Sequence, residues 1–515
     1  MLEKWINFCH FFLSKRKNSF ILLQIHAIIF TLCLKTVKQA PKKTNTLPSE
    51  LVILETQKEG NLPFGDTIIQ EEMQMKKFVA LVLVLALALT CFAGCSSSSS
   101  SSQAGGSSAA TGGSDSGKQL SGKVVYWSMY NEGEPEAMAI QKAADMFMED
   151  YPDCEVEIQW TGRSNQEIVG PALEGGEQID ILDNFSYSTS TDRYMDITDM
   201  MQSPALGQED MTVEESLLPV LNLANAQSQE AAGLATDKYY GVQIAPWVVG
   251  FFYNKDLFAQ AGVTEAPTTW TEFMEVCEKL KAAGINAITC DDAYMTLIPN
   301  NYLARLVGSD TIKAMSADAA DPAWQSEQVA QAFQAMEALS PYMSPQTATN
   351  KYPAGQQEFA LGDAAMYLNA SWMPSEVAET AGDDFPWGFF AFPVVEGGVE
   401  GAGYTSVGGV PLAVYSESPN PEAAKEFLRY VLSKEVQDYL AEMGGAPATV
   451  GSEWTGARAE CTDVIAAADK VASLNCDLSS EFVSAVFTLE MNKVLTGQTT
   501  ADKAVETLTA ESAKY

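Results

Sequence analysis

The feature that most constrains the fold is an alternation of strand-like and helix-like segments that begins near Gly122. The stretch GKVVYWSMY is rich in β-branched and aromatic residues, which favour strands. Residues 134–150 then repeat apolar side chains at helical spacing and stop before Pro152. Residues 154–160 (CEVEIQW) and 178–185 (QIDILDNF) predict two further strands. This order predicts a parallel α/β unit, in which ligands collect at the carboxyl ends of the strands.

Two later segments are strongly specified helices. In TTWTEFMEVCEKLKAAG, Thr269 and Glu272 form a capping box, and Gly284 ends the helix. In NPEAAKEFLRYVLSKEVQDYLAEMGG, Asn420 is the expected N-cap and Pro421 the first residue of one long helix. Both segments carry an apolar stripe, so both are expected to pack on a core.

An export signal begins at Met75 rather than at the first residue. Two lysines precede an apolar run, Phe78–Leu89, that is shorter than the roughly 20 residues of a membrane-spanning helix. The run leads to FAGC, which is similar to a bacterial lipobox and predicts a lipid on Cys95, although Phe92 stands where leucine is commoner. We therefore expect residues 75–94 to be a lipoprotein signal peptide. An ordinary cleaved signal peptide is the alternative.

The residues before this signal have the features of a leader that is mostly untranslated. The segment from Gln70 to Glu72 is what a purine-rich ribosome-binding site yields in this frame, close before Met75. Residues 1–74 are therefore interpreted as an untranslated leader that precedes the true start. The alternative is a first membrane helix over Phe20–Leu34, a short stretch that polar residues interrupt.

The part of the chain from Cys95 onward begins with a low-complexity segment and is strongly acidic. Residues 95–117 are almost entirely serine, glycine, alanine and threonine, too small to form a core, and predict a flexible tether. Of the 31 Lys and Arg residues 11 precede Cys95, as do 7 of the 67 Asp and Glu residues, which leaves a formal charge of −40 on the exported part. This charge disfavours nucleic acid and an anionic membrane face as partners.

Histidine and cysteine usage exclude several kinds of chemistry. Both histidines, His10 and His26, lie in the leader, so the exported part has no Ser-His-Asp or Cys-His catalysis and no histidine-ligated zinc. Five cysteines follow Cys95, none of them in a C-x-x-C pair, and an odd number cannot all form internal disulfides. Buried thiols are expected, with a Cys461–Cys476 bridge as the alternative. No cofactor and no metal are predicted.

Four blocks of the sequence resemble, in order, one known family. They are YYGVQIAPWVVGFFYNKDLFAQAGVTEAPTTWTEFMEVCEKLKAAG from Tyr239, EFALGDAAMYLNASWMP from Glu358, SVGGVPLAVYSESPNPEAAKEFLRYVLSKEVQDYL from Ser406 and LTGQTTADKAVETL from Leu495. The blocks are similar to extracellular solute-binding proteins of ABC importers, in the carbohydrate group of maltose- and multiple-sugar-binding proteins. The resemblance spans about residues 123–508.

The resemblance implies an α/β fold with two lobes of the type II periplasmic-binding-protein kind. Each lobe has a mostly parallel sheet flanked by helices, and the ligand cleft lies between them. The expected boundaries are 118–248 and 407–455 for lobe 1, 249–406 for lobe 2 and 456–515 for C-terminal helices that lie mainly on lobe 2. The chain is expected to cross between lobes near Pro246–Phe251 and Ser406–Val410, with a backbone bend at Gly408-Gly409. Hinge closure around the ligand is the family's switching mode.

A sugar presents apolar C–H faces and hydroxyl edges, so its site needs aromatic rings with carboxylates, amides or arginine. Trp372 matches the ligand tryptophan of the family, and Trp247 lies at the first crossing. The candidate ligand-binding residues are Trp127, Asn131, Glu132, Arg163, Asp183, Asn184, Tyr187, Trp247, Asn369, Trp372 and Tyr404. Packing in the core is the alternative for Trp127 and for Trp247. Solvation is the alternative for Glu132, and pairing with a surface acid is the alternative for Arg163.

The resemblance implies a monomeric receptor, lipid-anchored at the extracellular face of the bacterial cell membrane. The receptor would capture a sugar or oligosaccharide and deliver it to an ABC transporter permease with its cytoplasmic ATPase. It would not be an enzyme. Two alternatives stay open: an extracellular glycoside hydrolase that works with two carboxylates, and the same fold binding an amino acid, polyamine or metal chelate. Aromatic residues near loops favour the sugar.

Mass spectrometry of the native protein tests the start site and the anchor together. Translation from Met75 and lipidation of Cys95 predict that no peptide preceding Cys95 is found. Recovery of the tryptic peptide TNTLPSELVILETQK, which starts at Thr44, would refute the start site. Lipid labelling of a Cys95→Ser variant would refute the anchor.

Overall fold

The structure is a computed structural model that describes residues 119–186 and 193–515. The expected leader, signal peptide, tether and lipidation site at Cys95 lie outside the described residues, as does the candidate ligand residue Tyr187. In the described part of the chain, no helix has both the length and the apolar character needed to cross a membrane.

One half of the central sheet is built from strands early in the chain. β1 (Gly122–Ser128) pairs in parallel with β2 (Cys154–Trp160) on one side and with β3 (Ile181–Asp183) on the other. α4 (Pro135–Asp150) connects β1 with β2, and α5 (Asn165–Glu174) lies between β2 and β3. The predicted strand–helix–strand unit is therefore confirmed.

The other half of the sheet comes from the middle of the chain. β8 (Ala364–Ala370) pairs in parallel with β7 (Asn286–Ile288). β9 (Trp387–Ala391) pairs antiparallel with the long strand β6 (Val242–Asn254), which is described below. Further helices of the described chain are α8 (Pro219–Ala231), α9 (Lys255–Gln260), α12 (Ser309–Ala317), α14 (Ala354–Ala360), α19 (Thr462–Ala467) and α21 (Ala501–Ser512).

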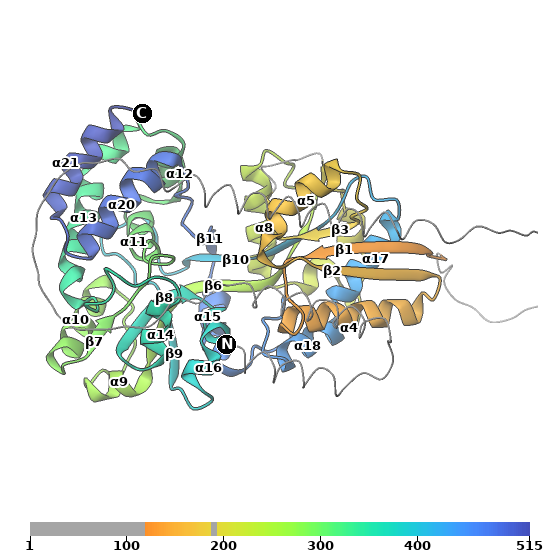
Figure 1. The fold of residues 1–515 in the computed structure, drawn as a ribbon, viewed down its shortest axis with the longest axis horizontal. Coiled ribbons are helices and arrows are strands. Elements are labelled where there is room, and N and C mark those ends of the chain that lie inside the picture. The colour runs from red at the N-terminus through yellow and green to blue at the C-terminus, as the bar shows by residue number, and fades with distance from the viewer. Residues whose placement is uncertain (1–118, 187–192) are drawn as a thin grey trace, which may run out of the picture. The chain divides into compact units, whose positions relative to one another are not determined.

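Two long strands, β6 (Val242–Asn254) and β10 (Tyr404–Val414), join the two halves (Figure 1). β6 pairs antiparallel with β10 up to Val248, and from Val249 onward it pairs with β8 instead. β10 pairs with β3 at its far end and with β11 (Lys470–Ala472) at its start. The strand order β2-β1-β3-β10-β6-β8-β7 therefore continues through both halves.

A bulge interrupts the pairing of these crossing strands. The register shifts between Gly408 and Val410, opposite Ala245, whose φ is +46°. A Cβ on Gly408 would lie 2.5 Å from the Trp247 ring, so only glycine fits there. The Gly408-Gly409 pair is thus a backbone bend, as predicted.

The capping-box helix is confirmed as α10 (Trp270–Ala282). The Thr269 side chain accepts a hydrogen bond from the Glu272 N–H, and the Glu272 side chain accepts one from the Thr269 N–H. Trp270 is buried against Phe273 of the same helix.

The second predicted helix is corrected, because it is two helices. α17 (Pro421–Val431) ends before Ser433, whose side chain caps α18 (Lys434–Glu442). Asn420 precedes α17 but does not cap it, since its amide donates a hydrogen bond to the Lys123 carbonyl at 2.8 Å. The hydrogen bond to Lys123, far away in the sequence, therefore takes the place of the expected capping bond to the first turn of α17.

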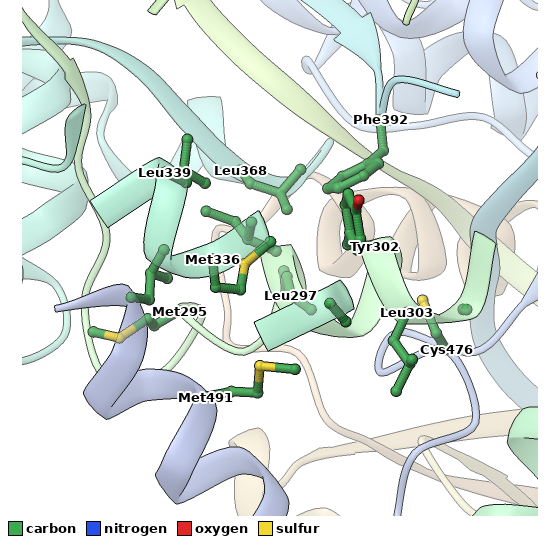
Figure 2. Packing of buried hydrophobic residues seen from close by; sticks show 14 of the residues in the cluster. Met295, Leu297, Tyr302, Leu303, Met336, Leu339, Leu368, Phe392, Cys476 and Met491 are labelled. Atoms are coloured by element: carbon green, nitrogen blue, oxygen red, sulfur yellow. The ribbon is translucent and has the colours of Figure 1, made fainter. Parts of the chain in front are cut away.

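Two large hydrophobic clusters make up most of the core, and one of them draws residues from both halves of the sheet. Figure 2 shows part of the cluster around α11 (Leu297–Val307), where side chains of α13 (Glu327–Leu339), α20 (Thr488–Leu495) and β8 meet. Cys476 packs in this cluster and Cys461 in the other. All five cysteines from Cys154 onward are buried and free, which confirms buried thiols and rules against the alternative bridge.

Asp183 ties together the carboxyl ends of β1 and β3. Its buried carboxylate accepts hydrogen bonds from the Tyr126 and Ser128 hydroxyls at 2.8 and 2.7 Å. It also accepts from the Met129 N–H at 2.8 Å and the Asn165 amide at 3.1 Å. Burial raises the pKa of Asp183 to about 6, while these hydrogen bonds oppose the rise. One side chain thus fixes the end of β1, the end of β3 and the start of α5.

Gly250 on β6 tests how closely the crossing strand packs. A Cβ there would lie against the Phe389 ring and 2.6 Å from the Phe390 carbonyl oxygen. Because that backbone cannot move aside, Gly250→Ala should lower the free energy of unfolding by about 1–3 kcal/mol. The control is Gly401→Ala, whose Cβ would meet nothing within 4 Å and should change stability by less than about 0.5 kcal/mol. Equal effects in urea unfolding would contradict the close approach.

The raised pKa of Asp183 predicts a pH dependence of stability. Because the folded state holds the Asp183 proton up to about pH 6, more tightly than the unfolded chain, protonation stabilises the fold. Wild type should gain stability over an Asp183→Asn variant, by up to about 3 kcal/mol, as the pH falls from about 7 to about 4. Urea unfolding of both proteins across this range measures the difference, and a difference that shrinks toward low pH would refute the prediction.

Candidate ligand-binding site

Four aromatic side chains, Trp247, Tyr294, Tyr352 and Trp372, form what we call the aromatic cluster. Trp247 lies on β6 and Trp372 just after β8, and their rings meet edge to face with centroids 5.7 Å apart. The Tyr294 ring lies 6.5 Å from Trp372 and 6.0 Å from Tyr352. Three of the rings are partly exposed and Tyr352 is 46% exposed, so the cluster offers flat apolar faces to a ligand.

A carboxylate stands beside the aromatic cluster. Glu376 is the last residue of α15 (Met373–Glu376), one helical turn after Trp372. One of its oxygens accepts a hydrogen bond from the Tyr352 hydroxyl at 3.3 Å, and the other accepts from the Gln356 amide at 2.7 Å. Glu376 is therefore connected to the cluster through Tyr352.

The electrostatics around Glu376 are dominated by burial and by neighbouring acids. Burial is the largest cause of the raised pKa of Glu376; the charge of Asp291 adds to it, and the charge of Arg163 opposes it. Burial, followed by the charge of Glu376, also raises the pKa of Tyr294. Asp291 is itself buried, which raises its pKa, while the Tyr367 hydroxyl stabilises its ionised form.

A second group of candidates lies at the carboxyl end of β1. Arg163 donates a hydrogen bond to the Met129 carbonyl at 2.8 Å and pairs with Glu134 at 3.0 Å. The Asn131 amide donates to the same Glu134 carboxylate at 2.7 Å. Asn131, Glu132 and Arg163 are all exposed, so they remain accessible although two of them are engaged within the protein.

Asp183 and Asn184 line a pocket of about 360 Å³ at the end of β3, together with Asn165 and Tyr194. The Asp183 oxygens already accept the four hydrogen bonds described above, which favours a structural role for this candidate. Trp127 is partly buried and packs against the small apolar cluster next to this pocket, in agreement with the packing alternative.

Asn369 and Tyr404 lie inside the protein rather than at a surface. Asn369 on β8 is fully buried, and its side-chain oxygen accepts a hydrogen bond from the Ala370 N–H at 2.8 Å. Tyr404 is 1% exposed and packs beside the buried Arg305, which donates to the Tyr404 carbonyl at 2.7 Å. Their burial disfavours the prediction that these two residues contact a ligand.

Sequence reasoning missed three residues of this site: Tyr294, Tyr352 and Glu376. Tyr294 follows β7 by six residues, so the rule that ligands collect at the carboxyl ends of strands could have found it. Glu376 stands four residues after Trp372, a spacing that puts two side chains on one helical face. Tyr352 has no comparable signal, because it reaches the site through tertiary packing.

The arrangement suits non-covalent binding of a ligand that is rich in hydroxyl groups. The aromatic cluster supplies apolar faces, and Glu376 supplies acceptors for hydroxyl donors. Within residues 119–186 and 193–515, no group of three or more His, Cys, Asp or Glu side chains could hold a metal ion.

Comparison with known proteins gives both a family and structural relatives. The model of the bacterial extracellular solute-binding protein family matches residues 131–438. A chitin oligosaccharide binding protein is 21% identical with a TM-score of 0.58, and the match covers 76% of this chain and 98% of that one. Apo RafE from Streptococcus pneumoniae is 18% identical with a TM-score of 0.57, covering 77% and 98%. Maltose-bound MalE3 of T. maritima is 20% identical with a TM-score of 0.53, covering 76% and 99%.

No curated protein matches the sequence. At the identities of the solved structures, their likeness establishes the fold, and the predicted α/β fold class is confirmed. The family model covers more than half of the chain and therefore establishes the family. This chain belongs to the bacterial extracellular solute-binding proteins.

Proposed function

We propose that this protein is a lipid-anchored receptor that captures a sugar or oligosaccharide and delivers it to an ABC transporter permease. The observation that carries the proposal is the aromatic cluster with Glu376 beside it, next to the strand that joins the two halves of the sheet. Similar structures are named for chitin oligosaccharide and maltose, which supports a sugar as the ligand. The lipid on Cys95 would keep the receptor, as a monomer, at the face where a permease collects its ligand.

Capture would occur by closure of two lobes about β6 and β10. We place lobe 1 at 118–248 and 407–455, lobe 2 at 249–406, and the C-terminal helices of 456–515 mainly on lobe 2. The change of pairing partner on β6 after Val248 supports this division. The bulge opposite Ala245 supplies backbone positions that can absorb a hinge rotation. A ligand held by both lobes would shift the equilibrium toward the closed form.

The ligand would contact residues from both sides of this hinge. We propose Trp247 and Trp372 as stacking residues, with Asn131, Glu132 and Arg163 as polar partners from lobe 1. Trp127, Asp183, Asn184, Tyr187, Asn369 and Tyr404 complete the set of candidates that the sequence suggests.

A carrier releases its sugar unchanged, whereas a glycoside hydrolase releases cleaved products. A thermal-shift screen of purified residues 118–515 against neutral, amino and acidic sugars would identify a ligand, which a carrier releases unchanged. Reducing ends released from an oligosaccharide, and abolished by replacing one Asp or Glu, would favour the hydrolase.

Trp372→Ala tests the stacking assignment. Stacking on a sugar would bury one face of the indole, which contributes about 1–3 kcal/mol. Calorimetry with the sugar found in the screen should therefore give an affinity about tenfold to a hundredfold weaker, because each 1.4 kcal/mol is about a factor of ten. The melting temperature of the ligand-free protein should change little.

Trp387→Ala is the matched control. Trp387 is also partly buried, but it packs against Phe252, Phe359 and Phe385. Its replacement should lower the melting temperature of the ligand-free protein and leave the affinity unchanged. A Trp372→Ala variant that behaves like this control would defeat the stacking assignment.

A further inference from the structure

Hydrogen bonds hold the Glu376 carboxylate in place but do not use all of its acceptor positions. A carboxylate offers about four acceptor positions, and within residues 119–186 and 193–515 the donors to this one are the Tyr352 hydroxyl and the Gln356 amide. Gln356 is fully buried, so its amide is a fixed donor. The other end of that amide, Oε1, has no hydrogen-bond partner among the described residues and leaves a second unused acceptor next to the carboxylate. Burial partly desolvates the Glu376 carboxylate, yet the residue keeps solvent-exposed surface from which a ligand can approach it.

The aromatic cluster decides which part of a ligand meets Glu376. Tyr352 both donates to Glu376 and contacts the Tyr294 ring, which in turn contacts Trp372. A sugar ring lying on these aromatic faces would therefore turn its edge substituents toward the carboxylate. The substituents on that edge are the groups by which sugars differ: a hydroxyl, an amino group or a carboxylate.

The charges around Glu376 disfavour an anionic substituent. Lys351 is paired with Asp292 at 2.8 Å, and Arg163 is paired with a carboxylate of its own at 3.0 Å. Both of these cations therefore already have a partner, whereas the buried Asp291 adds a further acid whose charge acts on Glu376. A ligand carboxylate placed here would meet repulsion, while an ammonium group would gain an ion pair and a cation–π contact.

We propose that Glu376 contacts the ligand directly and selects sugars that present hydroxyl or ammonium groups over sugars that carry a carboxylate. This inference deepens the proposed function and rests on it. A hydroxyl group donates a hydrogen bond to a charged acceptor, which is stronger than a bond between two neutral groups. The substrate class is therefore neutral or amino sugars, and uronic acids are excluded.

Calorimetry with matched sugars tests this selectivity. The probes are oligosaccharides of one length built from glucose, glucosamine or glucuronic acid, and the corresponding galactose series. Wild type should bind a neutral or amino member at least tenfold more tightly than the matched uronic acid. Glu376→Gln keeps the shape of the side chain and removes its charge, so its binding of the amino sugar should weaken at least tenfold. Its preference against the uronic acid should shrink as well.

Glu379→Gln is the control, because Glu379 is an exposed acid on α16 (Ala378–Ala381) only three residues away. It should leave every affinity within about twofold of wild type, and ligand-free melting temperatures verify that both variants fold. Sugar binding with the same selectivity in wild type and Glu376→Gln would overturn this inference alone, as would a wild-type preference for the uronic acid. Failure of wild type to bind any of the sugars would overturn the proposed function and this inference with it.

Discussion

The antiparallel pairing of β6 with β10 is the interaction on which both halves of the structure depend. Each half of the sheet would otherwise end at an unpaired edge, because β6 leaves β10 after Val248 and continues with β8 and β9. Trp247 occupies the position just before that change of partner, and Gly408 beside it lacks a side chain where the indole lies. The aromatic cluster is therefore attached to the part of the chain that any movement between the halves must involve.

Close packing of aromatic rings on glycine recurs where β6 pairs with β9. A Cβ at Gly250 would meet the Phe389 ring, and one at Gly388 would meet the Tyr253 ring. Glycine on one strand thus accommodates an aromatic ring from its neighbour, which fixes the pairing register without side-chain polarity. Near Ala245 the pairing of β6 with β10 shifts in register, so the backbone of this short segment is irregular.

Local patterns predicted the elements well and their ends less well. The capping box before α10 was predictable because both partners are three residues apart and need nothing else. Asn420 was misassigned because its amide donates to Lys123, almost three hundred residues earlier in the chain, a partner that no local window contains. The break before Ser433 was hidden because apolar spacing continues through it. In the candidate site, the resemblance of its block suggests Trp372, whereas Tyr352 joins the aromatic cluster only through the folding of the chain.

The two carboxylates that the sequence and the structure single out differ in how many internal donors they have. Asp183 stands at the end of a strand, where ligands collect in such sheets, yet Tyr126, Ser128, Met129 and Asn165 already donate to it. A buried carboxylate with that many donors stabilises the strand ends and keeps little capacity for a ligand. In the described part of the chain Glu376 receives two donors, which orient its carboxylate and leave acceptor positions unused. Sequence position alone does not distinguish these cases, because the donors come from elements that only the folded chain brings together.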